Sequence, residues 1–442
     1  MDAIPSTTPI PVSGHGSVRD DLLGRMRGAS GPYLAGVAVC GMIVAWALFA
    51  WGYQIVNGFG NTGVRRPVYW GFYIVNFVFW IGISHAGTLI SAILRLTGAE
   101  WRKPVTRAAE AITVFCLMIG GLFPLIHISR PWFFYWMLPY PNERLLWPNF
   151  RSPLFWDLTA ILTYLSGSVI YLYLPLIPDL AELANHSKGP KRRIYRALSL
   201  GWTGSDRQWQ ALERSMKLMA VVILAIAVSV HSVVAYDFSM SVMPTWHNTI
   251  FAPYFVVGAI FSGIAALVLV MAALRKLMGL ERYLREVHFV NLSKLLLLMS
   301  LIWGYFTFSE HLTTWYGNLP SEIRVFQIRE HGLYGMLFWT MVACNFVVPF
   351  VLVGISRLRS IPTIALSSAA VLVGMWLERF LIVFPPLSTP PLAAAWGSYA
   401  PSWIELSITA GTFAAMVLLY LLFIKAFPII AIWEYDDGVR SR

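Results

Sequence analysis

An imidazole and a carboxylate lie at the facing ends of two consecutive long apolar segments. His127 ends the first segment in GLFPLIHISRPW, and Asp157 opens the second in RSPLFWDLTA. If both segments are helices, the connection between them lets the two side chains face one pocket. A quinol suits such a pocket, because its two hydroxyl groups each release a proton as two electrons leave. The pair could equally form a structural hydrogen bond between two helices. From the residues alone, the functional and the structural interpretation have equal weight.

The connection between these two residues is rich in aromatic side chains and prolines. Residues 129–152 include several prolines, which forbid a continuous helix, and aromatic rings favour the headgroup level of a bilayer. We expect a rigid cap on the outer surface, with Trp132 and Tyr135 against the bound substrate. Arg379, in WLERFLIVFPP, either forms a local ion pair with Glu378 or positions an oxygen of the substrate ring.

Further polar side chains lie inside apolar segments, where their burial is costly and a functional role is the default hypothesis. Three hydroxyl residues follow an i, i+4, i+7 pattern and so share one helix face. Such a stripe either carries protons or lets helices pack closely, and packing is the favoured interpretation. The full set of proton-path candidates is Ser84, His85, Thr88, Ser91, His231, Asp237, Glu310 and His311.

The histidines and cysteines do not show the spacing of a haem or metal site. We expect His85 to lie too deep to pair with His127 or His231, which disfavours haem held by two histidines. His231 and Asp237 are six positions apart and face different sides of a helix, so they should not bind one ligand together. The three cysteines lie in separate apolar segments and predict neither a disulfide nor a metal site.

The elements that carry these residues are apolar segments of bilayer length. Of the 442 residues 57% are hydrophobic and only 12% are charged, and the mean hydropathy is +0.63. About 20 apolar residues cross the hydrocarbon core as a helix. We therefore predict an all-α integral membrane protein with about ten transmembrane helices, near residues 34–56, 68–94, 108–128, 154–178, 217–236, 251–274, 289–309, 332–355, 361–384 and 403–427.

The basic charge follows the predicted topology. With the N-terminus on the inner side, most of the 33 Lys and Arg residues fall in inner connections, as the positive-inside rule requires. We therefore expect that both termini lie in the cytoplasm, that lipid surrounds the helices, and that the protein does not bind nucleic acid. The longest inner connection, 183–215, is basic, and we expect a surface helix within it near 206–214.

A faint internal repeat indicates how the helices are grouped. Segments 68–98 and 251–279 both begin with aromatic residues and a proline and end in a basic residue and a glycine. An offset of four helices favours two four-helix bundles, helices 2–5 and 6–9, flanked by helices 1 and 10. The division that we expect is a cytoplasmic tail (1–31), a first peripheral helix with an outer loop (32–67), the first bundle with its inner loop (68–215), the second bundle (216–385) and the last helix with the C-terminus (386–442).

Four long motifs carry a resemblance to the polysulfide reductase (NrfD/PsrC-like) family of membrane subunits. Within it, the likeness is greatest to the ActC-type quinol-binding subunits of bacterial alternative complex III, and it covers roughly residues 32–428. The motifs are RRPVYWGFYIVNFVFWIGISHAGTLISAILRLTG, HISRPWFFYWMLPYPN, NFRSPLFWDLTA and VHSVVAYDFSMSVMPTWHNTIFAPYFVVGAIFSG.

The resemblance implies two four-helix bundles, a bacterial inner-membrane location and a quinol site near the outer face. By this resemblance, His127 and Asp157 occupy the positions that contact quinol in the family, and the substrate would be menaquinol or ubiquinol. The chain would bind no haem or iron–sulfur cluster of its own. Electrons would pass to an iron–sulfur subunit on the outer face and then to multihaem and monohaem cytochromes c, beside an ActF-like sister subunit that lacks the complete pair. Proton coupling would involve His85, Asp237, Glu310 and His311.

Three other functions remain open. The chain could be the quinone-binding anchor of another iron–sulfur oxidoreductase, such as a polysulfide reductase-like enzyme. It could be a secondary transporter, although its prolines cluster at helix ends rather than at the midplane breaks that transporters show. It could also be a purely structural anchor for peripheral subunits. The residues do not distinguish the quinone or the direction of electron flow.

Overall fold

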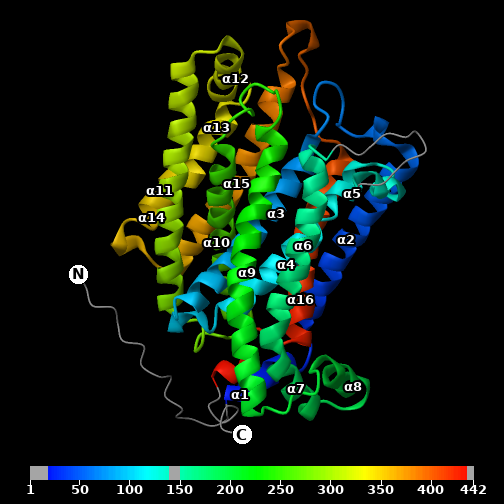
Figure 1. The fold of residues 1–442 in the computed structure, drawn as a ribbon, viewed down its shortest axis with the longest axis vertical. Helices are drawn as coiled ribbons and strands as arrows, with labels where there is room; N and C mark the ends of the chain where they lie inside the picture. The colour runs from blue at the N-terminus through cyan, green and yellow to red at the C-terminus, as the bar shows by residue number, and fades with distance from the viewer. Residues whose placement is uncertain (1–17, 139–149, 436–442) are drawn as a thin grey trace.

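Ten helical spans run along the long axis of the molecule in the computed structural model, which describes residues 18–138 and 150–435 (Figure 1). Each is long and apolar enough to cross a membrane, and the described residues form no strand. The prediction of an all-α protein with about ten membrane-spanning helices is confirmed. The spans are α2 (Gly31–Asn57), α3 (Gly71–Leu96), α4 (Thr106–Gly120) with α5 (Phe123–His127), α6 (Pro153–Tyr173) with α7 (Ile177–His186), α9 (Asp206–Ser239), α10 (Phe251–Leu277), α11 (Glu286–Gly317), α13 (Gly335–Val342) with α14 (Val348–Leu352), α15 (Ile361–Ser388) and α16 (Trp403–Ala426).

Shorter helices lie at the two ends of these spans. In the view of Figure 1, α1 (Val18–Met26) and α8 (Gly189–Leu198) lie at the lower end, and α12 (Pro320–Glu330) lies at the upper end. The charge distribution predicts that the upper end is the outer one. A π-helical segment (Ala343–Val347) joins α13 to α14, and the 3₁₀ helices are Phe59–Asn61, Glu100–Arg102, Pro131–Met137, Leu174–Leu176, Ser356–Leu358, Ala393–Ala395 and Ile432–Glu434.

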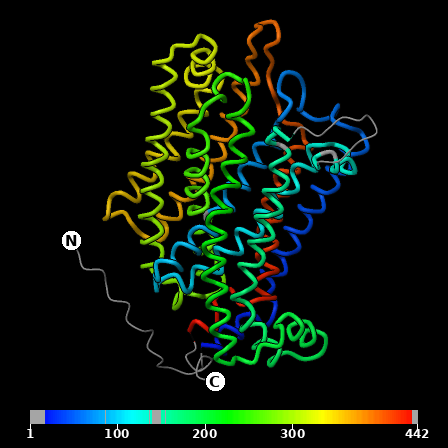
Figure 2. Tube along the Cα trace, viewed as in Figure 1, coloured from blue at the N-terminus to red at the C-terminus, as the bar shows by residue number. Residues whose placement is uncertain are grey.

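Helix α3 is the centre of the molecule. In its most apolar stretch 94% of the residues are buried, whereas in α2 the share is 6%. It packs against α4, α9, α10, α15 and α16, and α2 packs against α16 (Figure 2). Close contact with α4 depends on Gly87, because a Cβ atom there would collide with the carbonyl oxygen of Ala109.

The contacts between helices join the two predicted bundles along a shared boundary. Helices α3, α4, α6 and α9 pack in a ring, and α10 packs with α11 and α15. However, α10 also packs along α3 and α9, so the division into two groups of four stays a prediction. The proposed boundary between residues 215 and 216 falls within the single helix α9.

The predicted surface helix of the inner connection was wrongly placed. Residues 206–214 form the first turns of α9, which begins where the Ser205 side chain accepts a hydrogen bond from the Gln208 amide. The separate surface helix is α8, nearer the start of the same connection. A continuous helix through 206–214 is favoured because that N-cap satisfies its first amides and no helix breaker follows it.

A buried ion pair ties three elements together at the lower end. Arg107 of α4 donates to Asp179 of α7 at 2.5 Å, and both side chains are 2% exposed. Arg107 also donates to the carbonyl oxygens of Pro175 (2.8 Å) and Pro428 (2.9 Å). Asp179 accepts from the backbone of Trp433 at 3.4 Å. The pair therefore holds the chain that follows α16 against α4 and α7.

We expect Arg107→Met to destabilise the fold by about 3–5 kcal/mol, because it leaves Asp179 buried without its countercharge. SDS titration of the purified chain in detergent micelles measures the loss. The double variant Arg107→Met with Asp179→Leu should recover much of it. Arg193→Gln, at an exposed position of α8, is the control. If Arg107→Met unfolds at the same SDS concentration as the control, the ion pair does not stabilise the fold.

Candidate functional site

Two carboxyl groups face each other near the upper ends of α6 and α9. Asp157, in the second turn of α6, is 6% exposed, and Asp237 near the end of α9 is 8% exposed. They lie close enough to interact electrostatically. No donor group of the other described residues reaches Asp157 Oδ1 or either carboxyl oxygen of Asp237, and the two carboxyl groups can hydrogen-bond each other when one of them is protonated. Buried oxygens of this kind are costly, and they are available to an incoming hydroxyl donor.

His127 lies at the same end, against α2 and α3. Its ring lies 6.1 Å from the ring of Phe59 and 6.5 Å from that of Tyr73, and its Nδ1 is buried without a described partner. Tyr73 donates to Gln54, which in turn donates to the Ile126 carbonyl oxygen at 2.9 Å. This fully buried Tyr73–Gln54 link fixes the backbone beside His127 and was not singled out from the sequence.

The structure does not join His127 directly to Asp157. Among the described residues no hydrogen bond or ion pair links the two, and the nearer polar group to Asp157 is Asp237. That both residues face one substrate pocket therefore stays a prediction.

The expected aromatic cap is described only in part. Residues 131–137 form a 3₁₀ helix, in keeping with the prolines, whereas 139–149 lie outside the described residues. Trp132 is 56% exposed and Tyr135 is 39% exposed. Their proposed contact with a substrate stays a prediction.

The expectation that His85 is too deep to pair with His231 was wrong. The two rings contact each other with centroids 4.4 Å apart, because α3 and α9 cross at these positions. Both rings are buried. His85 Nδ1 lies 2.6 Å from the Ile81 carbonyl oxygen, while its Nε2 and both nitrogens of His231 lack a described partner. As the spacing predicts, His231 and Asp237 face different neighbours.

The hydroxyl stripe of α3 faces polar side chains of α4 and α6. Thr88 donates to Thr113 at 2.9 Å, and Ser91 donates to Glu110 at 2.6 Å. Ser91 also lies 3.3 Å from the Tyr171 hydroxyl.

Above these contacts, the Ser84 carbonyl oxygen accepts from Thr113 (2.7 Å) and from Tyr164 (3.2 Å), and the Tyr164 ring lies 4.8 Å from that of His85. We name these polar residues the α3 polar line. It consists of His231, His85, Tyr164, Ser84, Thr113, Thr88, Ser91, Tyr171 and Glu110.

Of the residues in the α3 polar line, Glu110 could most easily have been identified from the sequence as a functional candidate. It is a carboxylate inside an apolar segment, TRAAEAITVFC, which is the signal that marks a functional candidate in a membrane helix. Thr113, Tyr164 and Tyr171 gave no such signal, because uncharged hydroxyl residues are common in membrane helices. Only the packing of α4 and α6 against α3 reveals them.

Arg379 belongs to a second polar group, between α10, α11 and α15. It is 3% exposed and pairs with Glu378 at 2.9 Å, and its guanidinium lies 4.6 Å from the centre of the Phe255 ring. Trp303 donates to Glu378 at 2.6 Å. Arg379 lies close enough to His231 to act on it electrostatically. The local ion pair expected from the sequence is therefore present, and contact of Arg379 with a substrate stays a prediction.

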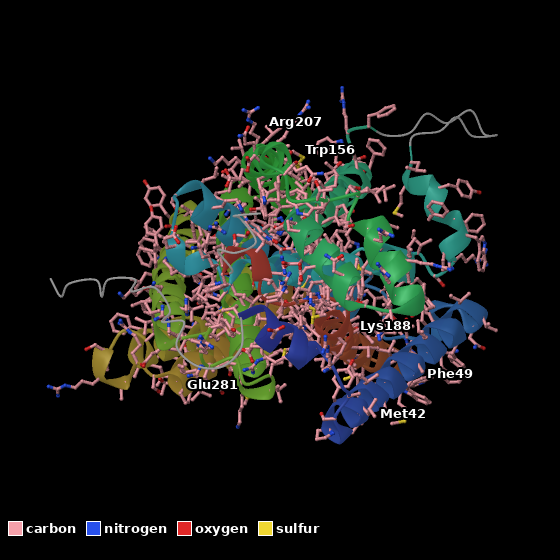
Figure 3. All side chains as sticks on the ribbon, turned by 90° about the horizontal axis from the view of Figure 1, so that it is seen from below. Met42, Phe49, Trp156, Lys188, Arg207 and Glu281 are labelled. Carbon is pink, nitrogen blue, oxygen red and sulfur yellow. The ribbon has the colours of Figure 1, made fainter. Side chains whose placement is uncertain are left out.

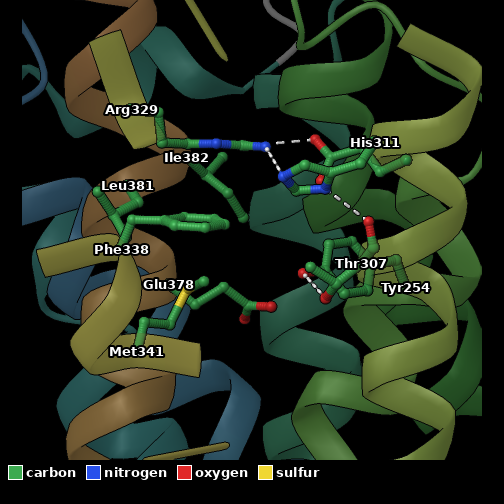
Figure 4. A pocket seen from close by; sticks show the side chains of 10 residues that line it. Tyr254, Thr307, His311, Arg329, Phe338, Met341, Glu378, Leu381 and Ile382 are labelled. Atoms are coloured by element: carbon green, nitrogen blue, oxygen red, sulfur yellow. Dashed lines mark hydrogen bonds and ion pairs between the residues drawn. The ribbon is translucent and has the colours of Figure 1, made fainter. Parts of the chain in front are cut away.

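Glu310 and His311 line a small cavity that adjoins this group (Figure 4). Arg329 of α12 points into the cavity and lies 3.4 Å from Glu310 and 3.3 Å from the His311 ring. His311 also contacts Glu330 at 2.7 Å. Burial acts to raise the pKa of Glu330, but the hydrogen bond from His311 and the surrounding positive charges outweigh it and lower this pKa. These bonds hold α12 over the upper end of α11.

Two comparisons with known proteins agree with this architecture. The sequence profile "Polysulphide reductase, NrfD" matches residues 60–391. A putative dimethyl sulfoxide reductase membrane subunit of Halobacterium salinarum is 25% identical over 435 residues, covering 92% of this chain and 95% of the relative. A selenate reductase subunit of Mesobacillus selenatarsenatis is 25% identical over 414 residues, covering 90% and 93%.

The ten helical spans and the family match together indicate a multi-pass membrane subunit of the quinone-interacting oxidoreductase complexes of this family. The chain belongs to the polysulphide reductase NrfD family. This confirms the family expected from the four motifs.

Removing the Arg379 charge should destabilise the protein by about 3–5 kcal/mol, because the buried Glu378 carboxylate loses its countercharge. We expect Arg379→Gln to show this loss in SDS titration. Arg379→Lys should show a smaller one, because it keeps the charge but not the planar guanidinium. Lys276→Gln, at an exposed position, serves as control. If Arg379→Gln and the control unfold at the same SDS concentration, the Arg379–Glu378 pair has no structural role.

Proposed function

We propose that the chain is the quinol-oxidising subunit of a respiratory or photosynthetic electron-transfer complex in the bacterial inner membrane. Menaquinol or ubiquinol binds near the upper end of α5 and α6, and the chain has both termini in the cytoplasm. The quinol loses two protons and two electrons and leaves as quinone. This chain binds no haem or iron–sulfur cluster, so the electrons pass to an iron–sulfur subunit seated on the outer face.

The observation that supports this proposal most is the Asp157–Asp237 pair, whose buried oxygens receive no donor from the other described residues. A quinol hydroxyl is a donor that fits such an acceptor, and a carboxylate in a dry site is an effective base when it lies within hydrogen-bond reach. His127 supplies a second acceptor through its unpartnered Nδ1. The two groups would each take one of the two quinol protons. The aromatic residues Trp132 and Tyr135 complete the proposed site. Arg379, which lies in the second polar group beside Glu378 and His231, would act on the substrate from the side of α15.

The complex that we favour is of the alternative complex III type, with this chain as its ActC-like subunit. The support is the four long motifs and the presence of both His127 and Asp157. The proposed partners are the iron–sulfur subunit, an ActF-like sister membrane subunit, and multihaem and monohaem cytochromes c. Electrons would then run from quinol towards a soluble carrier or an oxidase.

A second candidate follows from the names of the relatives. Both are subunits of reductases, one for dimethyl sulfoxide and one for selenate. A complex of that kind would also oxidise quinol in its membrane subunit but would deliver the electrons to a terminal reductase. The subunits that co-purify with the chain distinguish the two candidates: cytochromes c support the first, and a catalytic reductase subunit supports the second.

We also propose that quinol oxidation is coupled to proton movement along the α3 polar line. The line leads from the His85–His231 contact through Thr113 and Thr88 to Ser91 and Glu110. Two of its steps are side-chain hydrogen bonds, Thr88 to Thr113 and Ser91 to Glu110. Bound water would carry the proton across the other steps, because ring contact alone does not transfer a proton. Asp237 would link the line to the quinol site, and Glu310 and His311 would form a separate branch in the second group of helices.

Asp157→Asn should lower quinol-dependent reduction of the electron acceptor by about 100-fold or more, the usual effect of removing a general base. His127→Ala should also lower it. The assay uses the intact complex and is repeated with dithionite as electron donor, which bypasses the quinol site and should leave activity normal. Asp206→Asn, at an exposed position of α9, is the matched control. Normal quinol turnover by Asp157→Asn would remove this residue from the mechanism.

Glu110→Gln and Asp237→Asn should each lower the number of protons released per electron, because each interrupts the proposed path. The complex is reconstituted in liposomes, and external acidification is measured during quinol oxidation. Glu281→Gln, at an exposed lower-end position, should leave the ratio unchanged. If Asp237→Asn leaves the number of protons released per electron unchanged, Asp237 has no coupling role. If Glu110→Gln leaves it unchanged, the α3 polar line serves only the packing of the helices.

A further inference from the structure

Helix α8 is strongly basic and lies apart from the helix core. Four basic residues fall within its ten positions, and one more precedes it. All five side chains are exposed, and none forms an ion pair with a described residue. They are Lys188, Lys191, Arg192, Arg193 and Arg196.

The same helix exposes apolar side chains. Ile194 is 56% exposed and Leu198 is 37% exposed, and Leu200, just after the helix, is 69% exposed. At about 100° per residue, Ile194 and Leu198 share one side of the helix, and Arg192 and Arg196 share another. This combination of a basic face and an apolar face is typical of helices that lie in a membrane interface.

Two hydrogen bonds hold α8 at the level where the spans end. The Tyr195 hydroxyl donates to the carbonyl oxygen of Ala426, the last residue of α16, at 2.9 Å. Tyr173, the last residue of α6, donates to the carbonyl oxygen of Leu198 at 2.5 Å. The helix therefore lies at the level of the boundary between hydrocarbon and water.

Helix α8 lies at the periphery of the molecule, on the side where α2 runs (Figure 1 and Figure 3). In Figure 1, α8 projects sideways at the lower end, beside α7. Seen from that end, Lys188 lies on the side of the molecule where α2 runs (Figure 3). Helix α2 exposes Met42 (64%) and Phe49 (57%), as expected of a helix that faces lipid. A bilayer that surrounds α2 would have its surface at α8.

We propose that α8 binds the headgroups of anionic phospholipids in the inner leaflet, with Ile194, Leu198 and Leu200 inserted at the acyl boundary. Phosphate groups match the charge of the helix, and Arg is well suited to phosphate oxygens. Each basic residue near an anionic surface strengthens binding about fivefold. An acidic protein segment would satisfy the charges but would leave the apolar side chains without a hydrocarbon phase, so lipid is the better fit. The proposal is independent of the redox function.

Hydrogen–deuterium exchange of the full chain in nanodiscs tests this directly. Discs contain either phosphatidylcholine alone or phosphatidylcholine mixed with phosphatidylglycerol, and the peptide that covers 189–198 is followed. We expect at least about tenfold slower exchange in the anionic discs, with the difference shrinking at high salt. Arg192→Gln, Arg193→Gln and Arg196→Gln combined should abolish the difference, because three such residues contribute on the order of 100-fold in affinity.

The control removes three exposed basic residues elsewhere on the predicted inner side, Lys276→Gln, Arg282→Gln and Arg357→Gln. It should keep the difference between the two discs, and exchange in α3 and α10 should be normal in every variant. Equal exchange of α8 in both discs would overturn the proposal. So would an equal loss in the control variant, or protection that needs partner subunits and ignores lipid charge.

Discussion

Polar side chains on a helix that is surrounded by other helices must find their partners inside the protein, because hydrocarbon offers none. Helix α3 is under this constraint along most of its length. Near its upper end, Asn76 donates to Thr409 of α16 at 2.7 Å and accepts from Trp376 of α15 at 2.9 Å. Lower down, Thr88 and Ser91 bond to α4. The packing of α4, α6, α9, α15 and α16 around α3 is therefore tied to the polar residues that α3 carries.

The way this constraint is satisfied differs along the molecule. At the lower end the buried charges are paired, as in Arg107 with Asp179. At the upper end Asp157, Asp237 and His127 keep buried atoms without described partners. Unpartnered groups destabilise a fold, and they persist where a substrate or a water completes them. The unpartnered acceptors of Asp157, Asp237 and His127 are the physical basis for the proposal that quinol binds at the upper end.

The apolar segments determined most of what could be predicted. Their lengths predicted the ten helices, and four motifs predicted the family, which the profile match confirms. The Arg379–Glu378 pair, within one helix, could be predicted, but the partners of buried residues on other helices could not, because they depend on the depth at which helices cross. His85 and His231 illustrate this, since their contact arises where α3 and α9 meet. Glu110 could have been found from its charge alone.

A cryo-EM structure of the intact complex with a bound quinone analogue would show whether Asp157 and His127 contact the substrate. We expect density for the ring at the upper ends of α5 and α6, within hydrogen-bond distance of Asp157 and of His127. Density in the cavity lined by Glu310 and His311, or in a partner subunit alone, would contradict it. The Asp157–Asp237 contact would then be a structural feature of the helix bundle.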